Sequence, residues 1–150
     1  MNDVEWLYNF FELNNSDLTS GYFGKMSVRE AVLRTLQEVQ TMEDTLYDFA
    51  EEGFRSEITL QHLFKPLNNF EYAISIYQKS KARIRNGWLR LYAIRLNKNC
   101  YMVTGGAIKL TRDMKRSHLQ KELRKLNLAK IFLRNHGIDF PEDFNNFEDE

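Results

Sequence analysis

Cysteine, proline and histidine are scarce in this sequence of 150 residues, which contains one Cys, two Pro and three His. A lone Cys100 cannot form an internal disulfide, and with three scattered histidines it lacks the ligand spacing of a structural zinc site. No stretch approaches the roughly 18 consecutive apolar residues that a membrane-spanning helix needs. We therefore expect no disulfide framework, no metal or other cofactor and no membrane partner.

Apolar residues, in contrast, make up 43% of the chain and aromatic residues 13%. A domain of about 150 residues buries roughly 70% of the surface of its unfolded chain, so one core is sufficient for folding. We predict a single domain over residues 1–150 with an acidic tail from about residue 138. The first residues, Met1–Glu5, carry acids and no basic residue, which favours a cytoplasmic protein without a secretory signal.

The balance of 21 basic and 21 acidic residues hides a strong separation of charge along the chain. Residues 1–60 contain 4 Lys and Arg against 12 Asp and Glu, a net charge of −8. Residues 61–135 contain 17 against 3, a net charge of +14, and the remainder contains six acids and no Lys or Arg. Two interpretations are open: a basic face that attracts phosphate or an acidic partner, or segments that neutralise each other on folding.

Two helices are indicated by their caps and by their apolar spacing. Ser27 and Glu30 have the S-x-x-E spacing of a capping box, and the sequence predicts a helix over 28–52 that ends at Gly53. Its apolar stripe comprises Val28, Val32, Leu36, Val39, Met42, Leu46 and Phe49. The acids outside the stripe, which we expect on a solvated face, are Glu38, Glu43, Asp44 and Asp48.

A second, basic helix is predicted from a cap at Ser117 to about Asn135, with Gly137 as its stop. The basic groups of its last turn suit the negative end of the helix dipole. Its basic surface either binds phosphate or is a solvated face. The segment 5–13 at the other end of the chain is aromatic and is expected to be a short strand or a docked turn of helix. Near the C-terminus, 140–144 is expected to be a helical turn that begins at a proline.

The middle of the chain has the composition of strands. We predict strands over 72–78, 88–96 and 100–110, and the polar turn 97–99 indicates that the last two pair as an antiparallel hairpin. Pro66 places the segment 63–67 at a sheet edge or ends it there. Gly105-Gly106 inside a strand favours a bulge or a close approach, although a phosphate-binding loop is the alternative. The fold class is therefore α+β: a small antiparallel sheet of three to four strands with a long N-terminal helix and a basic C-terminal helix.

From Leu63 to about Asn135 this order of elements resembles the RelE/HigB class of bacterial toxins. The likeness rests on the segment 63–67, a strand near 70–77, the Arg-containing strand 89–94 and the Lys-x-Thr motif of Lys109-Leu110-Thr111 before a C-terminal helix. The resemblance implies a RelE-like fold and a metal-independent endoribonuclease that acts on translated messages at the ribosome and is neutralised by an antitoxin protein. One difference is that the segment 70–77 has no Arg, which the family usually carries there.

A ribonuclease of this class must stabilise the charge of a phosphorane and transfer protons, and fixed cations suit the first task. Under this interpretation, the catalytic candidates are Arg90, Arg95, Lys109, Arg112 and His118. The candidates for holding RNA are Lys79, Lys81, Arg83, Arg85, Tyr92, Lys115 and Arg116. Bases could also stack on Tyr77 or Trp88.

Each of these residues also has an ordinary structural interpretation. Strand cations usually face solvent or pair with acids, Trp88 and Tyr92 have the character of core residues, and His118 follows a predicted cap as an exposed first-turn residue. The alternative function is a non-enzymatic interaction module that binds an acidic protein or nucleic acid through its basic half. A third alternative is that the acidic segments cover the basic face.

Overall fold

The arrangement of the chain is given by a computed structural model, which describes residues 3–20, 22–68 and 76–138. The elements in order are α1 (Val4–Leu13), α2 (Asn15–Thr19), α3 (Val28–Glu52), the 3-10 turn η1 (Leu60–His62), β1 (Lys65–Pro66), β2 (Lys79–Arg83), β3 (Leu89–Asn97), β4 (Cys100–Ile108) and α4 (Ser117–His136). The four strands form one antiparallel sheet in the order β1-β2-β3-β4. The predicted α+β class is therefore confirmed, and no helix in the described ranges combines the length and apolarity needed to cross a membrane.

Helix α3 has the bounds that the capping box predicted. The Ser27 side chain accepts a hydrogen bond from the Glu30 N–H over 3.1 Å, and the last helical residue is Glu52. Gly53 follows as the C-cap in a right-handed conformation, so it ends the helix without the left-handed turn that is typical of a glycine stop. The apolar stripe buries Val32 and Met42. One of the acids expected on the solvated face is placed differently, because Glu38 is only 7% exposed.

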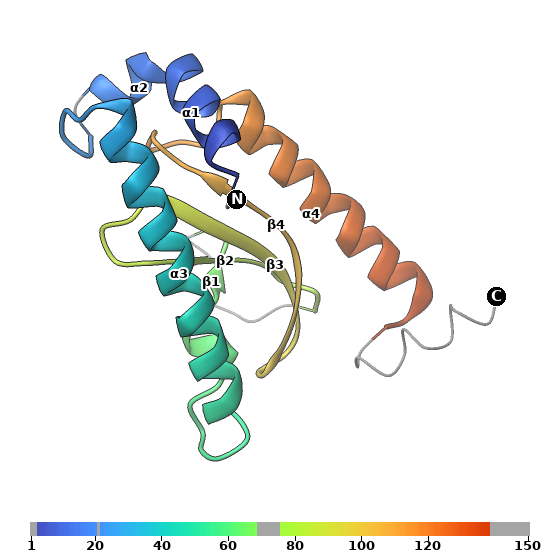
Figure 1. Cartoon of the computed structure of the whole chain (residues 1–150). Helices are drawn as coiled ribbons and strands as arrows, with labels where there is room; N and C mark the ends of the chain where they lie inside the picture. The colour runs from blue at the N-terminus through green and yellow to red at the C-terminus, as the bar shows by residue number, and fades with distance from the viewer. Residues whose placement is uncertain (1–2, 21, 69–75, 139–150) are drawn as a thin grey trace.

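Strand β3 is central and is covered on both faces, as its sequence predicts. Leu89 and Ala93 pack with residues of α3, whereas Tyr92 and Ile94 pack against α4. Successive side chains of a strand point to opposite faces, so one strand contributes to two cores. Figure 1 shows the resulting layers, with α3 and α4 on either side of the sheet.

The β3–β4 hairpin is also confirmed, and the bulge predicted at Gly105-Gly106 lies one residue before these glycines. Tyr92 is opposite Gly105, but Ala93 is opposite Val103, so Thr104 is the extra residue on β4. A bulge of this kind increases the local twist of the pair. A Cβ atom on Gly105 would lie 2.3 Å from a carboxylate oxygen of Glu122 on α4, so a larger residue there would require the end of the Glu122 side chain to move.

Of the two alternatives for the segment 5–13, the helical one is confirmed: it lies in the helix α1, whose Leu7 and Phe11 pack against α3 and Trp88. The strand predicted over 72–78 requires correction at its end, because residues 76–78 are outside any strand and the strand β2 is Lys79–Arg83. Residues 72–75 of that prediction lie outside the described residues. The edge position predicted at Pro66 is confirmed by β1.

Helix α4 is close to its predicted range but is capped differently. Arg116, not Ser117, occupies the N-cap position, and no side chain provides a capping hydrogen bond. At the other end Gly137 has φ 61°, in the left-handed region where glycine is favoured, so the predicted stop is confirmed. The turn predicted at 140–144 and the acidic tail lie outside the described residues.

Candidate functional site

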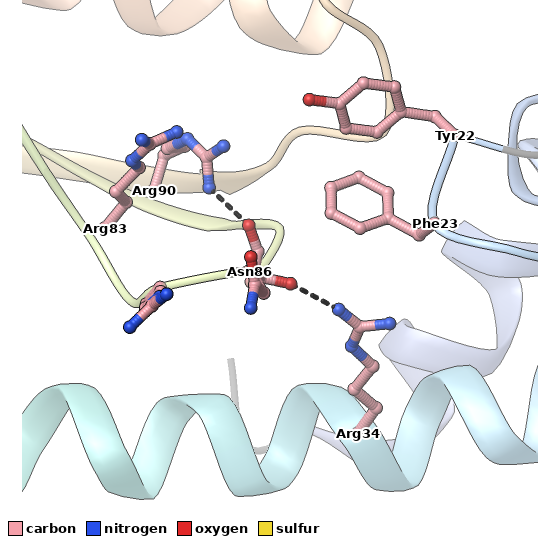
Figure 2. Close-up of a pocket in the computed structure, with 8 residues that line it drawn as sticks. Tyr22, Phe23, Arg34, Arg83, Asn86 and Arg90 are labelled. Atoms are coloured by element: carbon pink, nitrogen blue, oxygen red, sulfur yellow. Dashed lines mark hydrogen bonds between the residues drawn. The ribbon is translucent and has the colours of Figure 1, made fainter.

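Four arginines line one cavity of about 550 Å³ beside the turn between β2 and β3. We call this cavity the arginine pocket; its lining residues are Tyr22, Phe23, Arg34, Arg83, Arg85, Asn86, Gly87 and Arg90. Figure 2 shows the guanidinium groups of Arg83 and Arg90 together at one end and the two aromatic rings at the other. The pocket thus combines several fixed cations with two aromatic surfaces.

The turn that forms the floor of the pocket is held from two sides. Its four residues, 84–87, are closed by a hydrogen bond of 3.0 Å from the Gly87 N–H to the Ile84 carbonyl. Asn86 has φ 62°, a left-handed conformation that asparagine tolerates. Nη2 of Arg34 donates to the Asn86 carbonyl over 2.6 Å, and Nη1 of Arg90 donates to the Gly87 carbonyl over 2.8 Å. Two arginines therefore fix the turn and are themselves fixed by it.

Arg34 is held by a carboxylate and by two aromatic rings. Its Nε atom lies 3.3 Å from a carboxylate oxygen of Glu38, and its guanidinium carbon lies 4.4 Å from the centre of the Trp88 ring and 5.2 Å from that of Phe23. The other oxygen of Glu38 accepts a hydrogen bond from the Leu89 N–H over 3.1 Å. This buried carboxylate therefore joins α3 to the start of β3 and neutralises one of the four cations.

Arg90 is the most unusual group in the pocket. It is only 8% exposed, and its hydrogen bonds go to the carbonyls of Gly87 and Leu89. Among the described residues no carboxylate forms an ion pair with it. The pKa of Arg90 is lowered, first by burial and then by the charge of Arg83, its direct partner across the sheet. The charge of Glu38 offsets this lowering only in part. A buried cation without a carboxylate in direct contact is unfavourable, so an anion is the ligand that this position favours.

The remaining two arginines are exposed and available to a ligand. Arg83 ends β2 and Arg85 belongs to the turn, and neither forms an ion pair with a carboxylate in the part of the chain that is described. Guanidinium groups bind phosphate and carboxylate oxygens in a two-pronged geometry. The arrangement can therefore bind an anion without first breaking an ion pair at these two residues.

A second, smaller cavity of about 200 Å³ shares Arg90 with the arginine pocket. We call it the lysine cavity; its lining residues are Leu67, Asn68, Lys81, Arg90, Tyr92, Lys109, Met114 and Leu123. Nζ of Lys109 donates to the Arg112 carbonyl over 2.8 Å. The pKa of Lys109 is lowered by burial and by the nearby charges of Arg90 and Lys81. The two cavities thus place cations on both sides of one buried arginine.

Several predicted site residues lie away from both cavities. Arg95 is near the far end of β3, where Nη2 donates to Gln61 over 3.3 Å in a separate cavity of about 250 Å³. Arg116 forms a two-pronged ion pair with Asp17, with both N–O distances 2.8 Å. Lys79 donates to the Asn127 side chain. These three residues are therefore engaged elsewhere.

The predicted acid or base and the predicted stacking rings are also occupied. His118 is not an exposed first-turn residue: its Nε2 atom lies 2.8 Å from the Ile108 carbonyl and its ring meets the edge of Phe10. Tyr92 is fully buried and donates its hydroxyl to the sulfur of Met114 over 3.6 Å, and burial raises the pKa of Tyr92 to about 12. Trp88 is likewise buried and donates to Thr35 over 2.9 Å. The core interpretation of Trp88 and Tyr92 is confirmed, because a base cannot stack on a fully buried ring.

Arg112 and Lys115 lie in the loop between β4 and α4. The guanidinium carbon of Arg112 is 5.3 Å from the centre of the Tyr22 ring, so Arg112 is adjacent to the arginine pocket without lining it. Lys115 is exposed, and its N–H donates to Asp113 over 2.9 Å.

Four residues that line the pocket were not among the predicted site residues: Tyr22, Phe23, Arg34 and Asn86. In the sequence, Arg34 lies one helical turn before Glu38, a spacing that is typical of an ordinary ion pair on a helix surface. Its role depends on the turn after β2, which is distant in sequence. Asn86-Gly87 was the available local signal, because this pair is common in tight turns.

The described residues contain no group of three His, Cys, Asp or Glu side chains that could hold a metal ion. The arginine pocket has the chemistry of an anion site instead. No protein-family model, no curated protein and no solved structure matches this chain.

Proposed function

We propose that the protein binds RNA and that the arginine pocket holds phosphates of the RNA backbone. The observation that carries the proposal is Arg90, a cation that is 8% exposed and has no carboxylate partner among the described residues. Arg83 and Arg85 extend its charge to the surface, and Lys81 and Lys109 extend it into the lysine cavity. A row of cations on both sides of a buried one suits a ligand with repeated negative charges.

Nucleic acid is favoured over an acidic protein because aromatic rings accompany the cations. Tyr22 is 55% exposed and lies at the end of the pocket opposite Arg83 and Arg90. Proteins that bind single strands combine a cationic groove with aromatic side chains on which bases stack. An acidic peptide would use the arginines but would gain little from this ring. Binding of an acidic protein without RNA binding is the outcome that would favour the alternative, non-enzymatic protein-binding module.

The proposal is tested by measuring the affinity of purified protein for a single-stranded RNA of about 12 nucleotides, by fluorescence anisotropy at one fixed salt concentration. Arg83→Ala should weaken binding about tenfold or more, since a hydrogen bond to a charged group contributes about 1.5–3 kcal/mol. Arg124→Ala is the matched control, because Arg124 is an exposed arginine of α4 that lines neither cavity. Equal affinity of Arg83→Ala and wild type, or an equal loss in both variants, would reject the pocket as the binding site.

Cleavage of the bound RNA is a second proposal, as expected of a RelE-like toxin with an antitoxin partner. It is supported by Lys109, whose lowered pKa favours proton transfer and whose amine lies in the same cavity as Arg90. Expression of the wild type should then suppress growth, and Lys109→Ala should relieve the suppression without reducing protein level. Purified protein that binds RNA but leaves it intact, and that is harmless on expression, would contradict the nuclease proposal and leave the binding proposal in place.

A further inference from the structure

We propose that the arginine pocket takes the terminal phosphate of an RNA strand, a phosphate monoester, and that the terminal base lies against Tyr22. This inference rests on the proposed RNA binding and specifies which part of the strand enters the pocket. It is carried by the depth of Arg90, by the excess of cations over carboxylates in the pocket and by the position of the aromatic rings.

The charge of the pocket exceeds what one internal phosphate supplies. Four arginines line it, and Glu38, through Arg34, is the one carboxylate in the described chain that forms an ion pair with any of them. An internal phosphodiester carries one negative charge, whereas a phosphate monoester carries about −1.5 to −2 at pH 7. The monoester therefore matches the three remaining cations more closely.

The burial of Arg90 favours the terminal phosphate of an RNA strand over an internal phosphate. Nη1 of Arg90 is used by the Gly87 and Leu89 carbonyls, which leaves Nε and Nη2 without a protein acceptor among the described residues. Because Arg90 is nearly buried, a ligand must reach these groups from inside a cavity. An internal phosphate has a sugar on both sides, but a terminal phosphate presents three free oxygens at the end of one chain and can enter end-on.

The opposite end of the pocket offers a place for one base. The Tyr22 and Phe23 rings meet edge to face with centroids 4.7 Å apart, and Figure 2 shows both across the cavity from Arg83 and Arg90. Arg112 lies 5.3 Å from the Tyr22 ring centre and is a further cation beside it. A volume of about 550 Å³ falls in the range of roughly 300–1,000 Å³ of small-ligand sites. The pocket thus has the size and polarity for a nucleotide end.

The inference is tested with three unlabelled RNAs of one sequence, carrying a 5′-phosphate, a 3′-phosphate or hydroxyls at both ends, by titration calorimetry on the full chain. One phosphorylated strand should bind about tenfold or more tightly than the strand with two hydroxyl ends, and which one it is identifies the end. Arg83→Ala should remove this preference and Arg124→Ala should retain it. Equal affinities for all three strands would overturn the inference; if Arg83→Ala then weakened all three, the proposed RNA binding would stand without it. Absence of binding by every strand would overturn both.

A second measurement isolates the base. Adenosine monophosphate should displace the bound RNA, and adenosine at the same concentration should not. Tyr22→Phe should retain this displacement, whereas Tyr22→Ala should raise the concentration of adenosine monophosphate required by about fivefold or more. If inorganic phosphate displaced the RNA as well as the nucleotide did and Tyr22→Ala had no effect, the place assigned to the base would be wrong.

Discussion

Arg83 and Arg90 are direct partners across the β2–β3 pair, so two guanidinium groups face each other in the sheet without a carboxylate between them among the described residues. Like charges at directly opposed positions destabilise an antiparallel pair. Arg90 is moreover nearly buried, and the charge of Arg83 contributes to lowering its pKa. We therefore expect the pair to reduce the stability of the fold and to increase the affinity of the pocket for an anion.

Removing one of these charges should stabilise the free protein. We expect Arg83→Gln to raise the free energy of unfolding by about 0.2–1 kcal/mol, the range for a single cross-strand pair, because Gln keeps the length of the side chain and removes the repulsion. Urea denaturation followed by circular dichroism measures this change. Arg124→Gln on α4 is the control and should leave the value unchanged; an Arg83→Gln protein less stable than wild type would show that the repulsion is not significant.

Glu38 should be essential for stability although it is one of many acids on α3. Glu38→Ala leaves the Leu89 N–H without its acceptor and Arg34 without its counter-charge. Loss of a partner for a buried donor costs about 1–3 kcal/mol, so we expect a decrease of that size in the free energy of unfolding. Glu43→Ala, at an exposed position of the same helix, should change it by less than about 0.5 kcal/mol. Equal effects of the two substitutions would refute the role assigned to Glu38.

Lys109 should lose its proton at lower pH in the folded protein than in the unfolded one. Its pKa is lowered by burial and by Arg90 and Lys81, and only the neutral amine reacts with acetic anhydride. Labelling of Lys109 across pH, measured by mass spectrometry, should therefore reach half its maximum at lower pH in the native protein than in urea. Saturating RNA should shift the native midpoint upward, since phosphate favours the ammonium form. A native midpoint at or above the unfolded one would contradict the prediction.

The ion pair between Asp17 and Arg116 should stabilise the fold in a pH-dependent way. Arg116 lowers the pKa of Asp17 below its ordinary value of 3.8. The stabilisation is therefore present above the pKa of unfolded Asp and is lost as the pH falls through the lower, folded value. We expect Asp17→Asn to melt at a lower temperature than wild type at pH 7, with a difference that shrinks below about pH 4. A difference in melting temperature that did not depend on pH would show that the pair contributes through shape alone.

Local signals in the sequence account for the elements that were predicted well. The Ser27 cap and the apolar stripe define α3, and the polar turn at 97–99 defines the β3–β4 hairpin. The strand at 79–83 was missed because the β-branched and aromatic residues lie before it. Its alternating pattern was nevertheless present, since Ser80 and Ala82 are buried between charged neighbours.

The composition of the site was less predictable, because it depends on contacts that are distant in sequence. Charge was sufficient to identify three of the pocket residues: Arg83, Arg85 and Arg90. The strand observed at this place, β2, contains cations, whereas the predicted segment 70–77 contains none. Arg95 and Arg116 had the same charge but bind Gln61 and Asp17. Charge alone cannot distinguish these two groups, since the partner of each arginine is set by the tertiary fold.

The salt dependence of RNA affinity tests the central claim most directly. Each phosphate of a single strand that a cation neutralises contributes about 0.7 to the slope of the logarithm of affinity against the logarithm of salt concentration. If Arg83 and Arg85 together hold the phosphate that enters the pocket, the slope of the Arg83→Ala/Arg85→Ala protein should be shallower than that of the wild type by about 0.7 or more. Parallel lines for the two proteins would contradict the account, because the pocket would then hold no phosphate of the bound strand.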